Sequence, residues 1–266
     1  MTDALAIGMF IFALFYQTLA FHPIYAGSRR QISSSVTGSA TADPSLNIIT
    51  FTEDDETLID AATFMVDSFW LGSDHQVIGD VKSISINSRS KLIQEQAYDL
   101  SSKYAERMGK RLLDSRFLIG KNADSGIILG VVGVETTLYD KGRKNILSEH
   151  RAYKDSMVEQ VTKELLSPGY IAICCLSNLA VRQELRGRGI ALQLCTEAER
   201  VAAEWKYNSI FLKVEVTNTA ARSLYEMKLN YLLESTIESA SAMRVQADTG
   251  ALIEVDADTL ILKKKL

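Results

Sequence analysis

One short run of residues combines glycines and arginines directly before a predicted helix. It reads Arg186, Gly187, Arg188, Gly189, Ile190 and Ala191. The first turn of an α-helix has N–H groups without intrahelical partners and a positive dipole end, so it attracts anions. Glycine lets the backbone approach a phosphate closely and adopt positive φ. The run therefore predicts a phosphate-binding loop to which both arginines add charge, and the alternative is a solvated turn between a strand and a helix.

The elements on either side of this loop are those that would position it. Residues 170–181 are almost wholly apolar, which is typical of a central strand buried on both faces. Beyond the loop, apolar residues recur every three or four positions and predict an amphipathic helix. Its buried stripe would contain Ile190, Leu194, Ala198, Val201 and Trp205. A strand at 210–216 and a helix at 219–229 complete this region.

A second motif lies downstream, at residues 218–226. It has the pattern N-x-x-A-x-x-L-Y, and the first loop has the pattern R-x-x-G-x-A. Together, in this order and at this spacing, the two motifs resemble the GNAT family of acetyltransferases, and the similarity covers about residues 170–233. One departure is Asn230, where the family usually has glycine. Asparagine tolerates the left-handed backbone that a helix end requires.

The resemblance implies an α/β GNAT fold, in which a mixed central sheet of about six to seven strands is flanked by helices. It also implies acetyl-CoA as cosubstrate and no metal. In that family the loop holds the pyrophosphate of coenzyme A, and the preceding strand splays away from its neighbour and pairs with the pantetheine arm. The residues implied to bind the cofactor are Leu179, Ala180, Val181, Arg186, Gly187, Arg188, Gly189, Ile190, Ala191, Asn218 and Tyr225.

The resemblance further implies direct attack of an amine on acetyl-CoA. A backbone N–H at Leu179 or Val181 would polarise the thioester carbonyl, and Tyr225 would protonate the departing sulfur. Considered alone, Tyr225 is a core aromatic and Asn218 is a helix N-cap. Both roles are compatible with contact to the cofactor.

The general base is left open by the sequence. The strand at 170–181 carries no carboxylate, so Glu135 on the preceding strand is the candidate. Its alternatives are a surface glutamate without function and a chain of waters ending at backbone carbonyls. Ser177 and Asn178 are candidates for positioning the acceptor amine, unless they only complete the hydrogen bonds of the strand end.

The rest of the chain alternates between strands and helices, which favours a sheet covered on both faces. The tail after residue 239 predicts a single further strand. The predicted elements are strands at 47–52, 116–121, 127–139 and 260–262, and helices at 58–69, 93–108 and 153–165, with a hairpin turn at 122–126.

Composition excludes several other classes of protein. The formal net charge is −4, whereas a nucleic-acid binder needs a net basic face. Cys174, Cys175 and Cys195 lie in apolar stretches without zinc-site spacing, so we expect small buried side chains. The three histidines are far apart in the sequence and do not form the pattern of a hydrolase triad or a histidine metal site.

The N-terminus has the composition of a targeting sequence. Residues 1–20 contain an apolar run that predicts a signal peptide. Residues 21–45 predict a transit-peptide-like segment, because residues 21–42 contain no acidic residue and many hydroxyls. The junction at 20–23, Ala-Phe-His-Pro, resembles bipartite plastid presequences of algae. We therefore expect plastid import, no stable membrane association after processing, and an acetyltransferase domain at 46–266. A secreted protein and a retained membrane anchor are the alternatives.

The resulting hypothesis is an N-acetyltransferase that transfers acetyl to a primary amine. The expected acceptors are protein N-terminal α-amines, lysine ε-amines or both, as for plastid members of the family. The alternatives are acetylation of a small amine, such as a polyamine or amino acid, and a regulatory module that binds coenzyme A without turnover. No nucleic-acid partner is expected.

Overall fold

The computed structural model describes residues 45–51, 55–73, 76–104, 114–147 and 168–266. All of them belong to one compact unit, Thr41–Leu266. The strands are β1 (Leu46–Thr50), β2 (Val77–Ile78), β3 (Ser115–Asn122), β4 (Ile128–Asp140), β5 (Asn145–Leu147), β6 (Tyr170–Val181), β7 (Ser209–Glu215), β8 (Leu232–Gln246) and β9 (Leu252–Lys265). The helices and helical turns are α1 (Asp55–Met65), η1 (Val66–Trp70), η3 (Val81–Ser83), α2 (Ile86–Tyr104), η6 (Gln183–Leu185), α4 (Ile190–Glu204), α5 (Thr219–Arg222) and η7 (Ser223–Lys228).

The strands of the described residues form one nine-stranded sheet with the order β1-β3-β4-β6-β7-β9-β8-β2, and β5 pairs with β4. Neighbouring strands are antiparallel except for β6 with β7 and β2 with β8. Because β2 and β5 have only two and three residues, seven longer strands make up most of the sheet. The expected mixed α/β sheet flanked by helices is confirmed.

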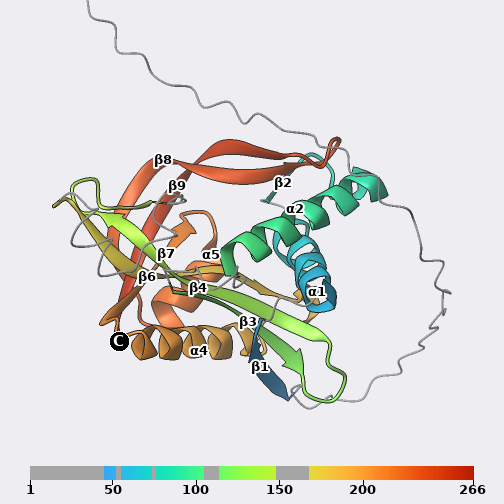
Figure 1. The fold of residues 1–266 in the computed structure, drawn as a ribbon. Helices are drawn as coiled ribbons and strands as arrows, with labels where there is room; N and C mark the ends of the chain where they lie inside the picture. The colour runs from blue at the N-terminus through green and yellow to red at the C-terminus, as the bar shows by residue number, and fades with distance from the viewer. Residues whose placement is uncertain (1–44, 52–54, 74–75, 105–113, 148–167) are drawn as a thin grey trace, which may run out of the picture. The chain divides into compact units, whose positions relative to one another are not determined.

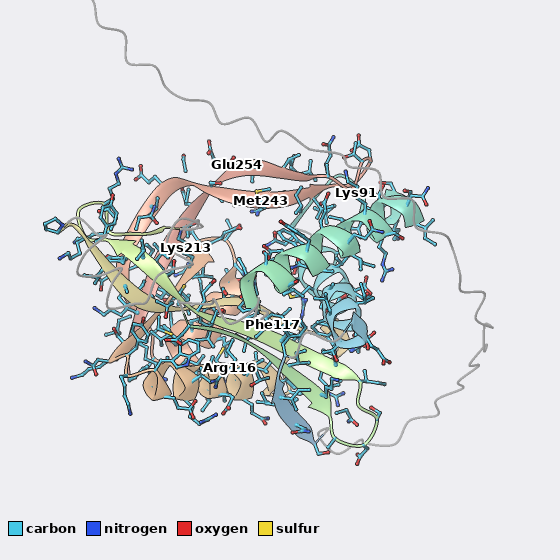
Figure 2. All side chains as sticks on the ribbon, viewed as in Figure 1. Lys91, Arg116, Phe117, Lys213, Met243 and Glu254 are labelled. Atoms are coloured by element: carbon cyan, nitrogen blue, oxygen red, sulfur yellow. The ribbon has the colours of Figure 1, made fainter. Side chains whose placement is uncertain are left out.

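Alternate residues of the central strands face two different hydrophobic cores. On β3, Arg116 pairs with Glu204 of α4, whereas the adjacent Phe117 packs with residues of α1 and α2 (Figure 2). Helix α4 therefore covers one face of the sheet, and α1 and α2 cover part of the other (Figure 1). The buried stripe of α4 contains Leu194 and Val201, in agreement with the helical periodicity.

Strands β6 and β7 separate from each other before they end. Their parallel ladder contains only three pairs, from Cys174 with Ile210 to Leu176 with Leu212. Beyond it, β6 continues to Val181 along β4, and β7 continues to Glu215 along β9. The two strands thus diverge, and toward the gap each has a backbone edge that pairs with no other described strand. This is the splay that the family resemblance implies.

The C-terminal region differs from the sequence prediction. Instead of one short strand at 260–262, two long strands, β8 and β9, form an antiparallel hairpin. The register shifts twice along the hairpin, and β8 is rich in serine, alanine and glutamate, which have low strand propensity. Because these features interrupt a regular period of two, the sequence pattern was too weak to identify the hairpin.

The distal end of the hairpin is held by tertiary contacts. β8 pairs with β2, and Val245, Ala247 and Leu252 pack against residues near η1 and α2. Arg244 also donates to the Glu215 carboxylate at 2.6 Å, in an ion pair whose side chains are only 11% and 16% exposed. Figure 1 shows this hairpin extending from the sheet toward α2.

The other predicted elements agree with the structure within a few residues where they can be compared, except that α2 begins at Ile86 and not at 93, and that the short strands β2 and β5 have no counterpart in the prediction. The strand preceding the loop spans Tyr170–Val181, as predicted, and β3 and β4 form the expected hairpin. Asn230 has a φ of 58°, the left-handed conformation expected after the second motif. The helix predicted at 153–165, the end of the helix predicted at 93–108 and the targeting segments before residue 45 lie outside the described residues.

Candidate active site

A cleft of about 870 Å³ opens between η1, the end of β6, the beginning of α4 and the α5–η7 segment. Among the described residues, its lining contains the cations Arg186 and Lys228 and no carboxylate. The lining residues are Ser68, Phe69, Gly72, Ser73, Gln76, Leu179, Ala180, Val181, Gln183, Leu185, Arg186, Gly187, Gly189, Ile190, Ala191, Leu192, Thr217, Asn218, Thr219, Ala220, Ala221, Ser223, Leu224 and Lys228. Of the eleven residues predicted to bind a cofactor, all line it except Arg188 and Tyr225.

The glycine loop has the backbone that its sequence predicts. Gly187 and Gly189 have φ values of +81° and +80°, and a Cβ at either position would meet no atom within 4 Å. Their requirement for glycine is therefore conformational and not steric. Gly189 is the N-cap of α4, no side chain caps it, and the first turn contains no acidic residue. The first N–H groups of α4 are left available to an anion in the cleft.

Arg186 has a structural role in addition to the cofactor contact that the sequence predicts. Its guanidinium donates to three backbone carbonyls: Nε to Val181 at 3.3 Å, and Nη2 to Ser68 at 3.1 Å and Gly72 at 3.2 Å. These bonds tie the loop to the end of β6 and to the η1 segment. The side chain that was expected to add charge beside a phosphate thus also joins two walls of the cleft.

The opposite wall is formed by the second motif. Asn218 caps α5, because its Oδ1 accepts from the Ala221 N–H at 3.1 Å. The capping role that the sequence predicts is confirmed. Asn218 and the adjacent Thr217 and Thr219 also line the cleft, and Lys228 adds a cation at the end of η7.

Tyr225 lies in the core beside the cleft. Its ring is 6% exposed and contacts Tyr231 edge to face, with ring centroids 5.8 Å apart. Burial raises the pKa of the Tyr225 phenol, and the neighbouring Cys195 and Cys175 act in the same direction. The phenol therefore stays protonated at neutral pH, as a proton donor must. Its role as the acid is a prediction.

A polar cluster lies on the face of the sheet that α2 approaches. Glu135 pairs with Cys175 across β4 and β6, and two positions further along Gly133 pairs with Ser177. Strand alternation places Glu135 and Ser177 on one face. The Tyr104 hydroxyl at the end of α2 lies 3.1 Å from Ser177 Oγ and accepts from Asn178 Nδ2 at 3.0 Å.

Charges in this cluster influence one another. The pKa of Tyr104 is raised by burial and then by the Glu135 carboxylate. Burial disfavours the ammonium of Lys103, but Glu135 and other nearby groups outweigh it, so the pKa of Lys103 is raised. Burial lowers the pKa of Lys213, which projects from β7 and is labelled in Figure 2. Glu135, which is half-buried, therefore lies near the Lys103 ammonium and the Tyr104 phenol, and it raises the pKa of both groups.

The cysteines behave as the sequence predicts. Cys174, Cys175 and Cys195 are buried and unbridged. Burial raises the pKa of all three thiols, that of Cys175 to about 12, so none is a thiolate nucleophile at neutral pH. Within the described ranges, no group of three or more histidine, cysteine, aspartate or glutamate residues is arranged to hold a metal ion. Among the same residues, no helix has the length and hydrophobicity to span a membrane.

Sequence reasoning missed one whole wall of the cleft. Ser68, Phe69, Gly72 and Ser73 come from η1 and the turn after it, more than one hundred residues before the glycine loop. In the sequence, this turn is indicated locally by Gly72, which follows the helical stretch that ends at Trp70. A Cβ on Gly72 would lie 2.6 Å from the Ser68 carbonyl oxygen, so this turn requires glycine. Tyr104 was also missed, because its spacing marks it only as a buried helical residue.

Comparison with known proteins supports the resemblance. Residues 162–231 match the model of the Acetyltransferase (GNAT) family. The chain is 42% identical over 50 residues to "GCN5-related N-acetyltransferase 7, chloroplastic" from Arabidopsis thaliana, and this match covers 19% of the chain and 18% of that protein. It therefore spans less than a fifth of the relative's length.

Two solved acetyltransferases align with most of the chain at low identity. Arabidopsis thaliana NAA60 in complex with acetyl-CoA is 14% identical with a TM-score of 0.48, and the alignment covers 84% of this chain and 99% of that one. A GCN5-related N-acetyltransferase from Kribbella flavida is 17% identical with a TM-score of 0.46, over 83% and 98% of the two chains. Similarity at this level carries no information about substrates. Over residues 162–231, which include both motifs, the chain therefore matches the GNAT acetyltransferase family.

Proposed function

We propose that this protein is an acetyl-CoA-dependent N-acetyltransferase that acts on a primary amine. The observation that carries the proposal is a cleft that runs from the N-terminus of α4, which no side chain caps, to the splay between β6 and β7, and whose described lining residues include no carboxylate. A diphosphate fits the first end, because the first N–H groups of α4 lie there and Arg186 adds positive charge in the preceding loop. A pantetheine arm fits the second, because the backbone edge of β6 pairs with no other described strand there and is available to amides.

In this proposal the acceptor nitrogen attacks the thioester carbonyl, so a C–N bond forms and the C–S bond breaks. A backbone N–H of Leu179 or Val181 stabilises the oxyanion. Tyr225 donates its proton to the departing thiolate, and burial keeps the phenol protonated until the thiolate forms. Glu135 accepts the proton of the amine, directly or through water, on the face of the sheet that carries Ser177.

Protein amines are the proposed acceptors, either N-terminal α-amines or lysine ε-amines. Ser177 and Asn178 would position the amine next to the thioester. The chloroplastic relative supports a plastid location, and the predicted presequence is consistent with it. The match to this relative covers 50 residues, so the protein acceptor and the plastid location are both part of the proposal.

Acetyl transfer from labelled acetyl-CoA tests the proposal. The purified chain is incubated with peptides that carry free α-amines or lysines and, separately, with polyamines and amino acids. We expect acetylated peptides by mass spectrometry. If only small amines were acetylated, the proposal of protein acceptors would be rejected. If no acetylated product formed at all, the proposed acetyltransferase activity would be rejected. Tyr225→Phe should lower turnover while acetyl-CoA affinity is retained, and unchanged turnover would mean that another group is the acid.

A further inference from the structure

The end of β6 contains a β-bulge at the point where the strand leaves β7. Between Gly133 with Ser177 and Val131 with Ala180, the register with β4 shifts by one residue. Asn178, within the bulge, has a φ of 53°, in the left-handed region that asparagine tolerates better than most residues with a side chain. Because a bulge leaves a residue without a ladder partner, other contacts must hold its backbone.

Tyr104 supplies the contacts that hold the bulge. Its hydroxyl accepts from Asn178 Nδ2 at 3.0 Å and lies 3.1 Å from Ser177 Oγ, so one phenol binds two consecutive side chains. The ring is 6% exposed and packs on Phe117 with centroids 5.0 Å apart. Ser115 Oγ donates to the Lys103 carbonyl at 2.8 Å, which anchors the end of α2 to β3. The hydroxyl therefore lies at a defined position relative to the sheet.

The opposite strand leaves room for this hydroxyl at Gly133. A Cβ there would lie 2.2 Å from Tyr104 Oη, 2.8 Å from Ser177 Oγ and 3.0 Å from Tyr104 Cζ. These distances are far below van der Waals contact, and the ring has no free space because it is packed in the core. Glycine at position 133 is thus a condition for Tyr104 to reach the bulge.

We propose that Tyr104 is a positioning residue. It fixes the backbone of the Ser177–Ala180 bulge and thereby orients the backbone N–H groups at the end of β6 toward the cleft. Leu179 and Ala180 line the cleft directly after the two side chains that Tyr104 binds. The catalytic consequence rests on the proposed function, because those N–H groups matter for turnover only if a thioester lies against them. Tyr104 itself acts through the strand and does not contact the reacting atoms.

Tyr104→Phe in the full chain removes the hydroxyl and keeps the ring. We expect kcat for acetyl transfer to fall about tenfold to a hundredfold, because small displacements of catalytic groups have effects of this size. The KM for acetyl-CoA should change by no more than about twofold, since the diphosphate is held elsewhere. Tyr98→Phe is the matched control, because Tyr98 is on the same helix and is 61% exposed.

Hydrogen exchange provides a readout that does not depend on turnover. Amides of the peptide that covers residues 175–181 should exchange about tenfold faster in Tyr104→Phe than in the wild type, whereas Tyr98→Phe should leave them unchanged. Gly133→Ala should also accelerate exchange, and this effect should be smaller in the Tyr104→Phe background, where the closest clash is absent.

The outcomes separate the two proposals. A wild-type chain without acetyl transfer would refute the proposed function, and exchange would still decide whether Tyr104 holds the bulge. An active wild type with unchanged exchange in Tyr104→Phe would overturn the positioning role. Faster exchange with unchanged kcat would overturn its catalytic consequence. Only faster exchange together with reduced kcat supports the inference.

Discussion

Arg186 offers a sharp test of how the cleft is built. Its guanidinium donates to carbonyls on both β6 and the η1 segment, so its removal should weaken the protein as well as ligand binding. A lysine retains the charge but cannot bridge three carbonyls in a fixed plane. Arg186→Lys therefore distinguishes a connecting role from a purely electrostatic one.

The magnitude follows from the three hydrogen bonds. Bonds that involve a charged group contribute about 1.5–3 kcal/mol each when they are buried. Arg186 is exposed and its bonds are 3.1–3.3 Å long, so about 0.5–1 kcal/mol each is appropriate. Arg186→Ala should then lower the free energy of unfolding by about 1.5–3 kcal/mol, and Arg186→Lys by most of that amount.

Urea denaturation measures the stability, and calorimetric titration with coenzyme A measures the affinity. Both Arg186 variants should bind coenzyme A more weakly, because the loss of these hydrogen bonds allows the glycine loop to separate from the η1 wall of the cleft. Arg188→Ala is the control: Arg188 is exposed and lies outside the lining, so stability should change by less than about 0.5 kcal/mol. If Arg186→Lys matched the wild type in both measurements, the connecting role would be refuted.

Three further predictions concern the loop, the hairpin and the buried tyrosines. Gly187→Val and Gly189→Val should each cost about 1–2 kcal/mol through their positive φ and abolish coenzyme A binding in calorimetry, whereas Gly126→Val, at a φ of +69° outside the cleft, should cost a similar amount and leave binding intact. Arg244→Ala should cost about 3 kcal/mol in urea denaturation, because it leaves Glu215 unpaired in a nearly buried position; a loss no larger than that of Arg200→Ala, whose partners are exposed, would contradict this. The pKa values of Tyr104, Tyr225 and Tyr231 are raised in the folded state, chiefly by burial, so their contribution to stability is complete below the unfolded pKa of about 10 and is lost as the pH rises above it. Tyrosinate absorbance of the folded chain should therefore remain below that of the urea-unfolded chain until alkaline unfolding, and equal absorbance above pH 10 would show that these phenols are accessible.

The sequence alone determined the part of the site that depends on neighbouring residues. A strand, a glycine loop and a helix follow one another over Tyr170–Glu204, and the positive φ of Gly187 and Gly189 follows from residue type. The same holds for the cap at Asn218 and the left-handed Asn230. These features are recognisable because the interactions that produce them span only a few positions.

Only the tertiary structure decided the contacts between distant segments. Tyr104 meets Ser177 across 73 residues, and Arg186 meets Ser68 across 118. No periodicity in either segment specifies such a pairing, because it depends on how α2 and η1 pack against the sheet. The β8–β9 hairpin was missed for a related reason: its strands have low intrinsic propensity, and its distal end is stabilised by β2 and the core near α2.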